Sequence, residues 1–208
     1  HKAIRRQRQM CIRDRDKAEK VMLELAYENV NQAFDQLLQF SDKIDEQIYK
    51  REDTVNYLDK VISEYISTAL ATPNLNVNIS QALSSYYLML VDIERISDYA
   101  VNMNHQATKR LQGDMTISEI EIVEHMKKLC VDMKNDLDDV EEAERKDDVI
   151  DSLVSSWREA QIQALKQKKC SSEVSMMLSR IFTDFERIND HALNVSQELD
   201  KITVEIPD

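Results

Sequence analysis

The chain has 208 residues, of which 42% are hydrophobic and 32% charged, and it contains one glycine and two prolines. Abundant Leu, Ala, Glu, Lys and Gln beside so few turn-forming residues argue against a β-rich fold and favour long helices joined by short connections. The formal net charge of -12 excludes a general attraction to the phosphate backbone of nucleic acid and leaves only a local basic patch as a route to such binding.

The first fifteen residues stand apart from the rest of the sequence. They hold five arginines between Arg5 and Arg15 and lack an apolar stripe of helical period. One interpretation is translated adaptor read-through at the end of an assembled gene fragment, which would leave the true upstream sequence missing. The alternative is a natural basic arm that meets a membrane surface or nucleic acid. We expect residues 1–15 to be a disordered or artefactual arm that the fold does not need.

Residues 16–113 are expected to form a first unit of three helices. Apolar residues recur at helical spacing from the start of this unit and predict a first helix of about 30 residues. The apolar pattern weakens over residues 41–53, and the second helix is expected to resume at Val55. Pro73 and the neighbouring asparagines interrupt the pattern, so the third helix is predicted over about residues 80–111.

The boundary between two units is expected near Gly113, the only glycine of the chain. Glycine readily takes the left-handed backbone conformation that closes a helix. Directly after it, the stretch from Thr116 to Glu119 reads "TISE", the capping-box pattern that opens a new helix. Gly113 and this stretch therefore mark the end of one helix and the start of the next.

Residues 114–202 are expected to form a second unit of three helices. The fourth helix is predicted from Ile117 to about Ala143, because apolar residues keep helical spacing over that range. The other expected features are a turn within residues 138–148, a cap of the sixth helix at Ser171 or Ser172, and a tail at residues 203–208.

One phrase of eleven residues occurs twice. "DIERISDYAVN" fills residues 92–102 and "DFERINDHALN" fills residues 184–194, with identical residues at seven positions. The two copies begin 92 residues apart. This distance indicates duplication of a three-helix unit, whereas solenoid repeats recur about every 20 to 50 residues. The sequence therefore predicts an all-α fold of two tandem three-helix bundles, with six long antiparallel helices.

The repeated phrase carries two carboxylates one helical turn apart. Glu94 and Asp98 lie roughly opposite the apolar stripe that contains Ile96, so we expect them on the outer side of their helix. Carboxylates at this spacing can hold a hard divalent or ferric cation. The alternative is a solvated face in which Arg95 forms helix-stabilising ion pairs. Repetition of the pair as Glu186 and Asp190 favours the ligand interpretation, because a solvated face has no need of the same residue order twice.

The sequence argues against an enzyme. The Glu-x-x-His spacing of di-iron bundles is absent, and we find no set of nucleophile, base and orienting residue. A glycine-rich phosphate loop cannot be built with one glycine. The three cysteines, Cys11, Cys130 and Cys170, form no C-x-x-C pair and fit a reducing cytoplasm. No stretch approaches the roughly 20 apolar residues that span a bilayer, so we expect a soluble piece.

The two phrases resemble the motif of PhoU proteins, in which an E-R-I-G-D-H-A-x-N-I-like phrase occurs once per three-helix repeat. The stretches at residues 52–66 and 147–175 look like the cytoplasmic PhoU-like tail of sodium-dependent phosphate cotransporters. The resemblance implies two three-helix bundles that regulate phosphate uptake. It also implies metal binding (Fe, Mn, Mg or Zn) at the acidic motifs. The implied ligands here are Glu94, Asp98, Glu186 and Asp190.

The same resemblance implies a membrane phosphate transporter domain as partner, upstream in the same chain or separate, and a cytoplasmic location tethered to the inner face of the membrane. A homodimer is a further possibility that the resemblance leaves open. Three alternatives stay open: a free-standing PhoU-type regulator of an ABC-type transporter and a sensor kinase, a purely structural helical domain, and a metal-dependent enzyme. An upstream transmembrane segment would separate the first alternative from the transporter tail.

The chain departs from the PhoU pattern at two places. PhoU proteins also carry an acidic pair on the second helix of each repeat, where this chain offers Asp59 with Ser63 and Val154 with Arg158. We therefore expect weaker metal binding in the second repeat. The glycine that PhoU proteins place before the motif aspartate is here serine in the first phrase and asparagine in the second.

Overall fold

The computed structural model describes the backbone of residues 2–205 and the side chains of residues 17–202. Over this range the chain forms α1 (Lys2–Leu38), α2 (Asp42–Leu70), α3 (Val77–Ala107), the short 3-10 helix η1 (Gln112–Asp114), α4 (Ile117–Asn135), α5 (Val140–Lys166) and α6 (Ser172–Glu205). The described residues contain no strand, which confirms the predicted all-α class.

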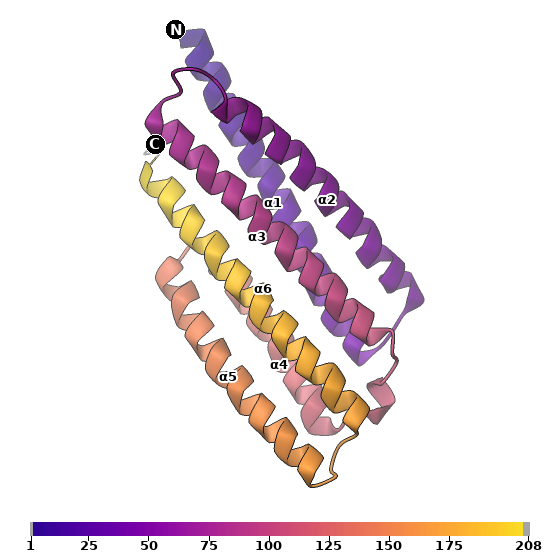
Figure 1. Cartoon of the computed structure of the whole chain (residues 1–208). Coiled ribbons are helices and arrows are strands. Elements are labelled where there is room, and N and C mark those ends of the chain that lie inside the picture. Colours follow the sequence, from indigo (N-terminus) through magenta and orange to yellow (C-terminus); the bar gives the residue numbers. More distant parts are fainter. Residues whose placement is uncertain (1, 206–208) are drawn as a thin grey trace.

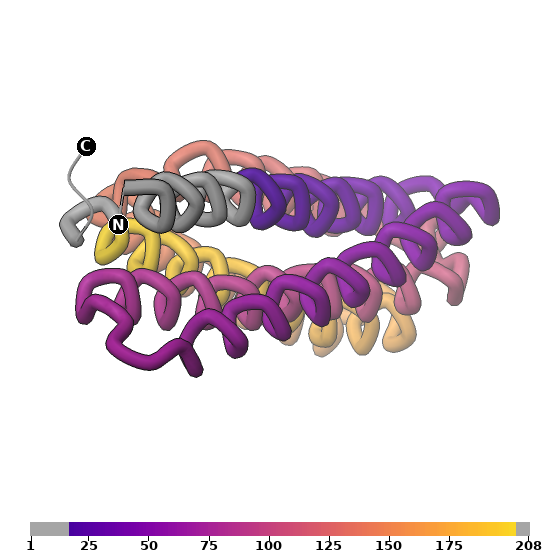
Figure 2. The backbone as a smooth tube through the Cα atoms, turned by 90° about the horizontal axis from the view of Figure 1, so that it is seen from above, coloured from indigo at the N-terminus to yellow at the C-terminus, as the bar shows by residue number. Residues whose placement is uncertain are grey.

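The helices form two groups of three that meet along α3 and α6. These two helices run antiparallel side by side at the centre of the molecule, with α1 and α2 next to α3 and with α4 and α5 next to α6 (Figure 1). A second contact between the groups joins α1 to α4. Seen from above, all the helices run along one long direction (Figure 2). The two predicted three-helix units are thus packed against each other along their length.

A single apolar core extends through both groups. Ile96 on α3 and Ile188 on α6 occupy equivalent places in the repeated phrase, and both are fully buried. Phe34 of α1 meets Phe185 of α6 edge-on, with ring centroids 6.4 Å apart. Apolar area removed from water is the main favourable contribution to folding. The apolar stripe predicted around Ile96 therefore belongs to a core that stabilises each repeat and also the contact between the two repeats.

The start of α2 differs from the prediction, because the helix begins at Asp42 and not at Val55. The weak apolar pattern of this stretch reflects polar side chains that find partners on α1. Arg51 donates to Asn29 Oδ1 at 2.7 Å and to Gln32 Oε1 at 2.6 Å. Buried polar groups that are paired in this way stabilise a helix interface without any apolar periodicity.

The end of α3 also differs from the prediction. The helix ends at Ala107, and Arg110, with φ of 55°, takes the left-handed conformation expected of Gly113. Gly113 lies in η1 and has no positive φ. The Arg110 guanidinium pairs with Asp42 at 2.9 Å and lies over the Phe40 ring at 4.7 Å.

The helix starts of the second group follow local capping patterns. Thr116 and Glu119 form the predicted capping box, and the Ser171 hydroxyl caps α6 by accepting from Val174 N at 3.1 Å. However, α4 ends at Asn135, well before the predicted end at Ala143. The turn falls at residues 136–139 because Asp139 caps α5, accepting from Glu142 N at 3.1 Å.

The first helix begins at Lys2, upstream of the expected start at Asp16. The side chains of residues 1–15 and the tail at residues 203–208 lie outside the described side chains, so the prediction of a dispensable arm stays a prediction. Within the described part of the chain, none of the helices combines the length and the apolar character that crossing a bilayer requires.

Candidate functional site

The two copies of the repeated phrase meet along the seam between α3 and α6. Asp92 of the first copy lies 2.7 Å from His191 Nδ1 and accepts from Asn194 Nδ2 at 3.1 Å, both in the second copy. Tyr99 stacks on His191 with ring centroids 5.8 Å apart. Part of the repeated phrase therefore serves to join the repeats, a role that the linear sequence did not reveal.

The other side of the first phrase faces α2 and builds cluster one, defined as Glu52, Asp59, Glu94 and Asp98. Glu52 is only 9% exposed, and one of its carboxylate oxygens accepts a hydrogen bond from the Ser97 hydroxyl. Its other oxygen, Oε1, is buried and makes no hydrogen bond within the described part of the chain. A buried carboxylate oxygen without a donor is costly, so this oxygen is an acceptor left available for a ligand.

Negative charge accumulates in cluster one. Burial first, and then the neighbouring Asp98, raises the pKa of Glu94 to about 6, although Arg95 acts in the opposite direction. Burial likewise raises the pKa of Glu52 and that of Asp59. Arg95 lies on the exposed side, 3.4 Å from Asp98 and 3.8 Å from Glu94. One exposed arginine leaves these carboxylates incompletely neutralised, which favours binding of a cation.

The second phrase builds an equivalent group with α5. Cluster two is defined as Asp147, Asp151, Glu186 and Asp190. Burial, followed by the charges of Asp151 and Asp190, raises the pKa of Asp147 to about 6. The Oδ1 atom of Asp147 is buried and without a hydrogen bond in the described part of the structure. Arg187 lies 3.1 Å from Asp190 and so repeats the arrangement of Arg95 and Asp98.

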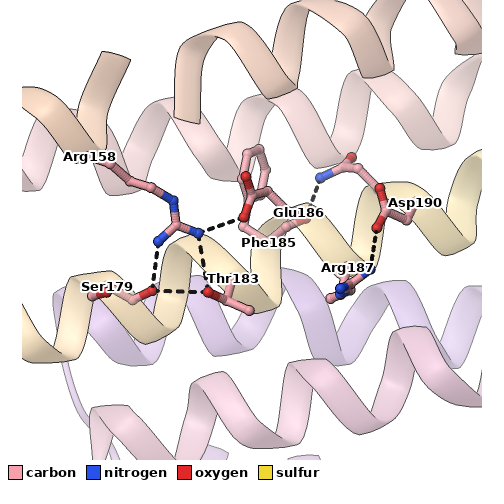
Figure 3. A network of polar contacts seen from close by, with 8 residues as sticks. Arg158, Ser179, Thr183, Phe185, Glu186, Arg187 and Asp190 are labelled. Atoms are coloured by element: carbon pink, nitrogen blue, oxygen red, sulfur yellow. Dashed lines mark hydrogen bonds and ion pairs between the residues drawn. The ribbon is translucent and has the colours of Figure 1, made fainter. Parts of the chain in front are cut away.

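Cluster two contains a cation that cluster one lacks. Arg158 of α5 reaches across to α6 and donates to Glu186 Oε2 at 2.6 Å (Figure 3). The same guanidinium donates to Thr183 Oγ1 at 3.2 Å and to the Ser179 carbonyl at 3.4 Å, and it lies 5.6 Å from the centre of the Phe182 ring. Charge-assisted contacts of this kind are the stronger hydrogen bonds in proteins.

Each of the two helix groups matches the sequence profile of a known domain. The sequence profile of the PhoU domain matches residues 20–107 and again residues 117–199. The chain belongs to the PhoU family. It is 24% identical over 190 residues to the "Phosphate-specific transport system accessory protein PhoU homolog 1" of Thermotoga maritima, an alignment that covers 86% of this chain and 81% of that protein.

Solved PhoU structures share the fold. The crystal structure of PhoU from Pseudomonas aeruginosa has a TM-score of 0.83 at 18% identity and covers 94% of this chain and 98% of its own. The phosphate transport system regulatory protein PhoU from Streptococcus pneumoniae has a TM-score of 0.81 at 18% identity, with coverage of 93% and 95%. The predicted pair of three-helix bundles is therefore a PhoU fold.

The expected exposure of the PhoU motif carboxylates needs correction. The side chains of Glu94 and Asp98 are 26% and 39% exposed, and those of Glu186 and Asp190 are 30% and 39% exposed. They lie half-buried at the rims of the interfaces with α2 and α5, not on an outer face. A helical wheel identifies which side of a helix faces the core, but it cannot show where a neighbouring helix packs beside the motif carboxylates.

The second helices carry further acids near the motif, at positions other than those compared with the PhoU pattern. The residues that face the motif lie two turns earlier than expected, at Glu52 on α2 and at Asp147 and Asp151 on α5. The buried positions of α2 and α5 correspond at an offset of 95 residues, as in the pair Val55 and Ile150. The spacing of Asp147 and Asp151, identical to that of the motif pair, was a usable signal.

The clusters offer the oxygen donors that a hard cation prefers. In the described part of the chain, however, no three Asp, Glu, His or Cys side chains converge closely enough to hold a metal ion. The buried Oε1 atom of Glu52, which makes no hydrogen bond in that part of the chain, fits such a ligand. Glu94, Asp98, Glu186 and Asp190 therefore remain predicted ligands, now accompanied by Glu52, Asp147 and Asp151.

Proposed function

We propose that this chain is a PhoU-type regulator of phosphate transport that acts by binding a membrane phosphate transporter. The observation that carries the proposal is the match of both repeats to the PhoU domain. The alignment with the Thermotoga protein, named as an accessory protein of a phosphate-specific transport system, covers 81% of that protein. This coverage supports a free-standing regulator more than a domain of a transporter.

A second candidate is the cytoplasmic tail of a sodium-dependent phosphate cotransporter. The resemblance of residues 52–66 and 147–175 to such tails favours it. Both candidates use the same fold and the same clusters, so the distinction concerns what precedes this chain in its gene. Membrane-spanning segments encoded directly upstream would establish the tail, whereas an upstream stop codon would establish the free-standing regulator.

We further propose that the acidic clusters bind a hard divalent or ferric cation. When bound, such a cation supplies the positive charge that the carboxylates of α2 and α3, or of α5 and α6, lack. Glu52 and Glu94 would hold it between α2 and α3, and Asp147 and Glu186 are the equivalent pair between α5 and α6. Occupancy would then change how firmly neighbouring helices are held, and with it the surface offered to the transporter.

The test of regulation uses a bacterial host whose own PhoU gene has been deleted. Expression of this chain should return phosphate uptake, followed with radioactive phosphate, toward the level of the undeleted host. The E94A/D98A variant should restore less if the cation is needed. Immunoblots and circular dichroism of the purified proteins control for amount and fold. Uptake that stays at the deletion level with folded, abundant protein would contradict the proposal.

A further inference from the structure

The two repeats differ at one position of their clusters. Because buried positions of α2 and α5 correspond at an offset of 95 residues, Arg158 occupies the place that Ser63 holds in the first repeat. The Ser63 hydroxyl donates only a long hydrogen bond of 3.4 Å to Asp59. Arg158 brings a full positive charge to the same place and directs it at the motif residue Glu186.

Arg158 is held firmly where it meets Glu186. Its guanidinium donates to a carboxylate, a hydroxyl and a backbone carbonyl (Figure 3). The Phe182 ring lies beside it. The side chains of Arg158 and Glu186 are 32% and 30% exposed, so water screens the pair only in part. A metal ion that used Glu186 would have to displace a cation already in place and leave its partners unpaired.

Cluster one has no such internal cation. Glu94 pairs with Arg95 on its exposed side at 3.8 Å, and Glu52 keeps a buried oxygen without a hydrogen bond in the described structure. We infer that Arg158 is a built-in substitute for the metal ion of cluster two, so that an added divalent cation binds only at cluster one. This inference rests on the proposed metal binding and assigns it to one repeat.

The test exchanges the two residues. Mn²⁺ is titrated calorimetrically into the full chain, and the number bound per chain is measured. The wild type should bind one ion. R158S, which copies the first repeat, should bind two, and S63R, which copies the second, should bind none. Adding E94A/D98A to R158S should remove one of its two ions and thereby assign the remaining one to cluster two.

Two controls keep the outcome specific. R145S removes an arginine from an exposed ion pair with Glu142 on the same helix, so it makes the same change of charge away from cluster two and should leave one bound ion. R158K keeps the charge but not the planar fork and should also leave one ion. Melting curves establish that each variant is folded, and R158Q replaces R158S if the serine variant is not.

The possible failures are distinct. Two ions in the wild type, or an unchanged single ion in folded R158S, would overturn the role of Arg158. Absence of binding in the wild type together with one ion in R158S would support that role and refute a site at cluster one. Absence of binding in every folded variant would refute metal binding at both clusters and this inference with it. Regulation of phosphate transport would still be tested independently by the uptake experiment.

Discussion

Ser97 connects three helices through one hydroxyl group. It accepts from Asn29 Nδ2 of α1 at 3.2 Å and donates to the buried carboxylate of Glu52 on α2. The equivalent residue in the second repeat, Asn189, instead donates to the Phe185 carbonyl of its own helix at 2.8 Å. The position before the motif aspartate therefore orients an acid of cluster one, but it does not do so in cluster two.

Replacing Ser97 with alanine should destabilise the fold by about 1–3 kcal/mol, because the buried carboxylate of Glu52 loses the hydrogen bond from this hydroxyl. Urea denaturation followed by circular dichroism measures the change. S84A is a matched control on the same helix, since the Ser84 hydroxyl is exposed and bonds only to its own helix at Ser80. Equal stability of S97A and S84A would mean that the hydroxyl contributes nothing to holding Glu52.

Asp184 gives the stability a pH dependence. Burial raises its pKa to about 6 despite Arg180 nearby, whereas an unfolded aspartate titrates near about 3.9. The folded state therefore binds the proton more tightly, so stability should rise as the pH falls from about 7.5 toward about 4. The raised pKa values of Glu94 and Asp147 act in the same direction.

The D184N variant should be more stable than the wild type at neutral pH, by about 1–2 kcal/mol after allowing for partial solvent screening. Its melting temperature should also rise less on acidification. Melting curves of the metal-free proteins across this pH range test both statements, with D138N in an exposed turn as the control. A variant that follows the wild-type pH profile would show that Asp184 has no part in it.

At the scale of helices, Glu119 links the start of α4 to its neighbours. It accepts from Thr116 N at 2.7 Å within the capping box and from Gln161 Nε2 of α5 at 2.6 Å. Gln161 also donates to Ser175 of α6 at 2.8 Å. A residue that the local pattern identifies as a cap is thus also the point at which three helices are tied together.

We therefore expect E119A to destabilise the fold more than T116A. Loss of the threonine cap should cost about 1 kcal/mol, whereas loss of Glu119 removes the cap and leaves the buried Gln161 amide short of an acceptor. Chemical denaturation of both variants provides the comparison. Equal losses of unfolding free energy in E119A and T116A would show that Glu119 acts only as a capping residue.

Local patterns predicted the helix features that depend on neighbouring residues, such as the capping box at Thr116 and the cap at Ser171. They missed the start of α2, where Arg51 has its partners on α1, and the left-handed residue Arg110, whose side chain contacts Phe40 and Asp42. Both features involve side chains far apart in sequence. No window of adjacent residues contains that information.

At the scale of the whole molecule, the repeated phrase correctly located α3 and α6 at equivalent places and identified half of each cluster. The other half was assigned two turns away in both repeats, at Asp59 and Val154 instead of Glu52 and Asp147, because the sequence of one helix does not say which of its turns packs opposite the motif. Glu52 and Asp147 could therefore be placed only once the helices were packed.

The continuous core should make the two repeats unfold together. Ile96 is fully buried in the apolar core that the two repeats share, so I96A should cost about 2–5 kcal/mol. Trp157 packs on Phe182 and Phe185 in the second repeat and reports on that half by fluorescence. The I96A midpoint should shift equally by fluorescence and by circular dichroism, whereas separate transitions would show that each repeat unfolds on its own.

The contact of Asp92 with His191 makes the two halves of the duplicated chain unlike each other. The equivalents of Asp92, His191 and Asn194 in the opposite halves are Asp184, Tyr99 and Asn102. If the first half packed against a second copy of itself, the phenol ring of Tyr99 would lie where the imidazole of His191 now contacts Asp92. Descendants of one ancestral segment have in this way become complementary partners, and neither can any longer stand in for the other.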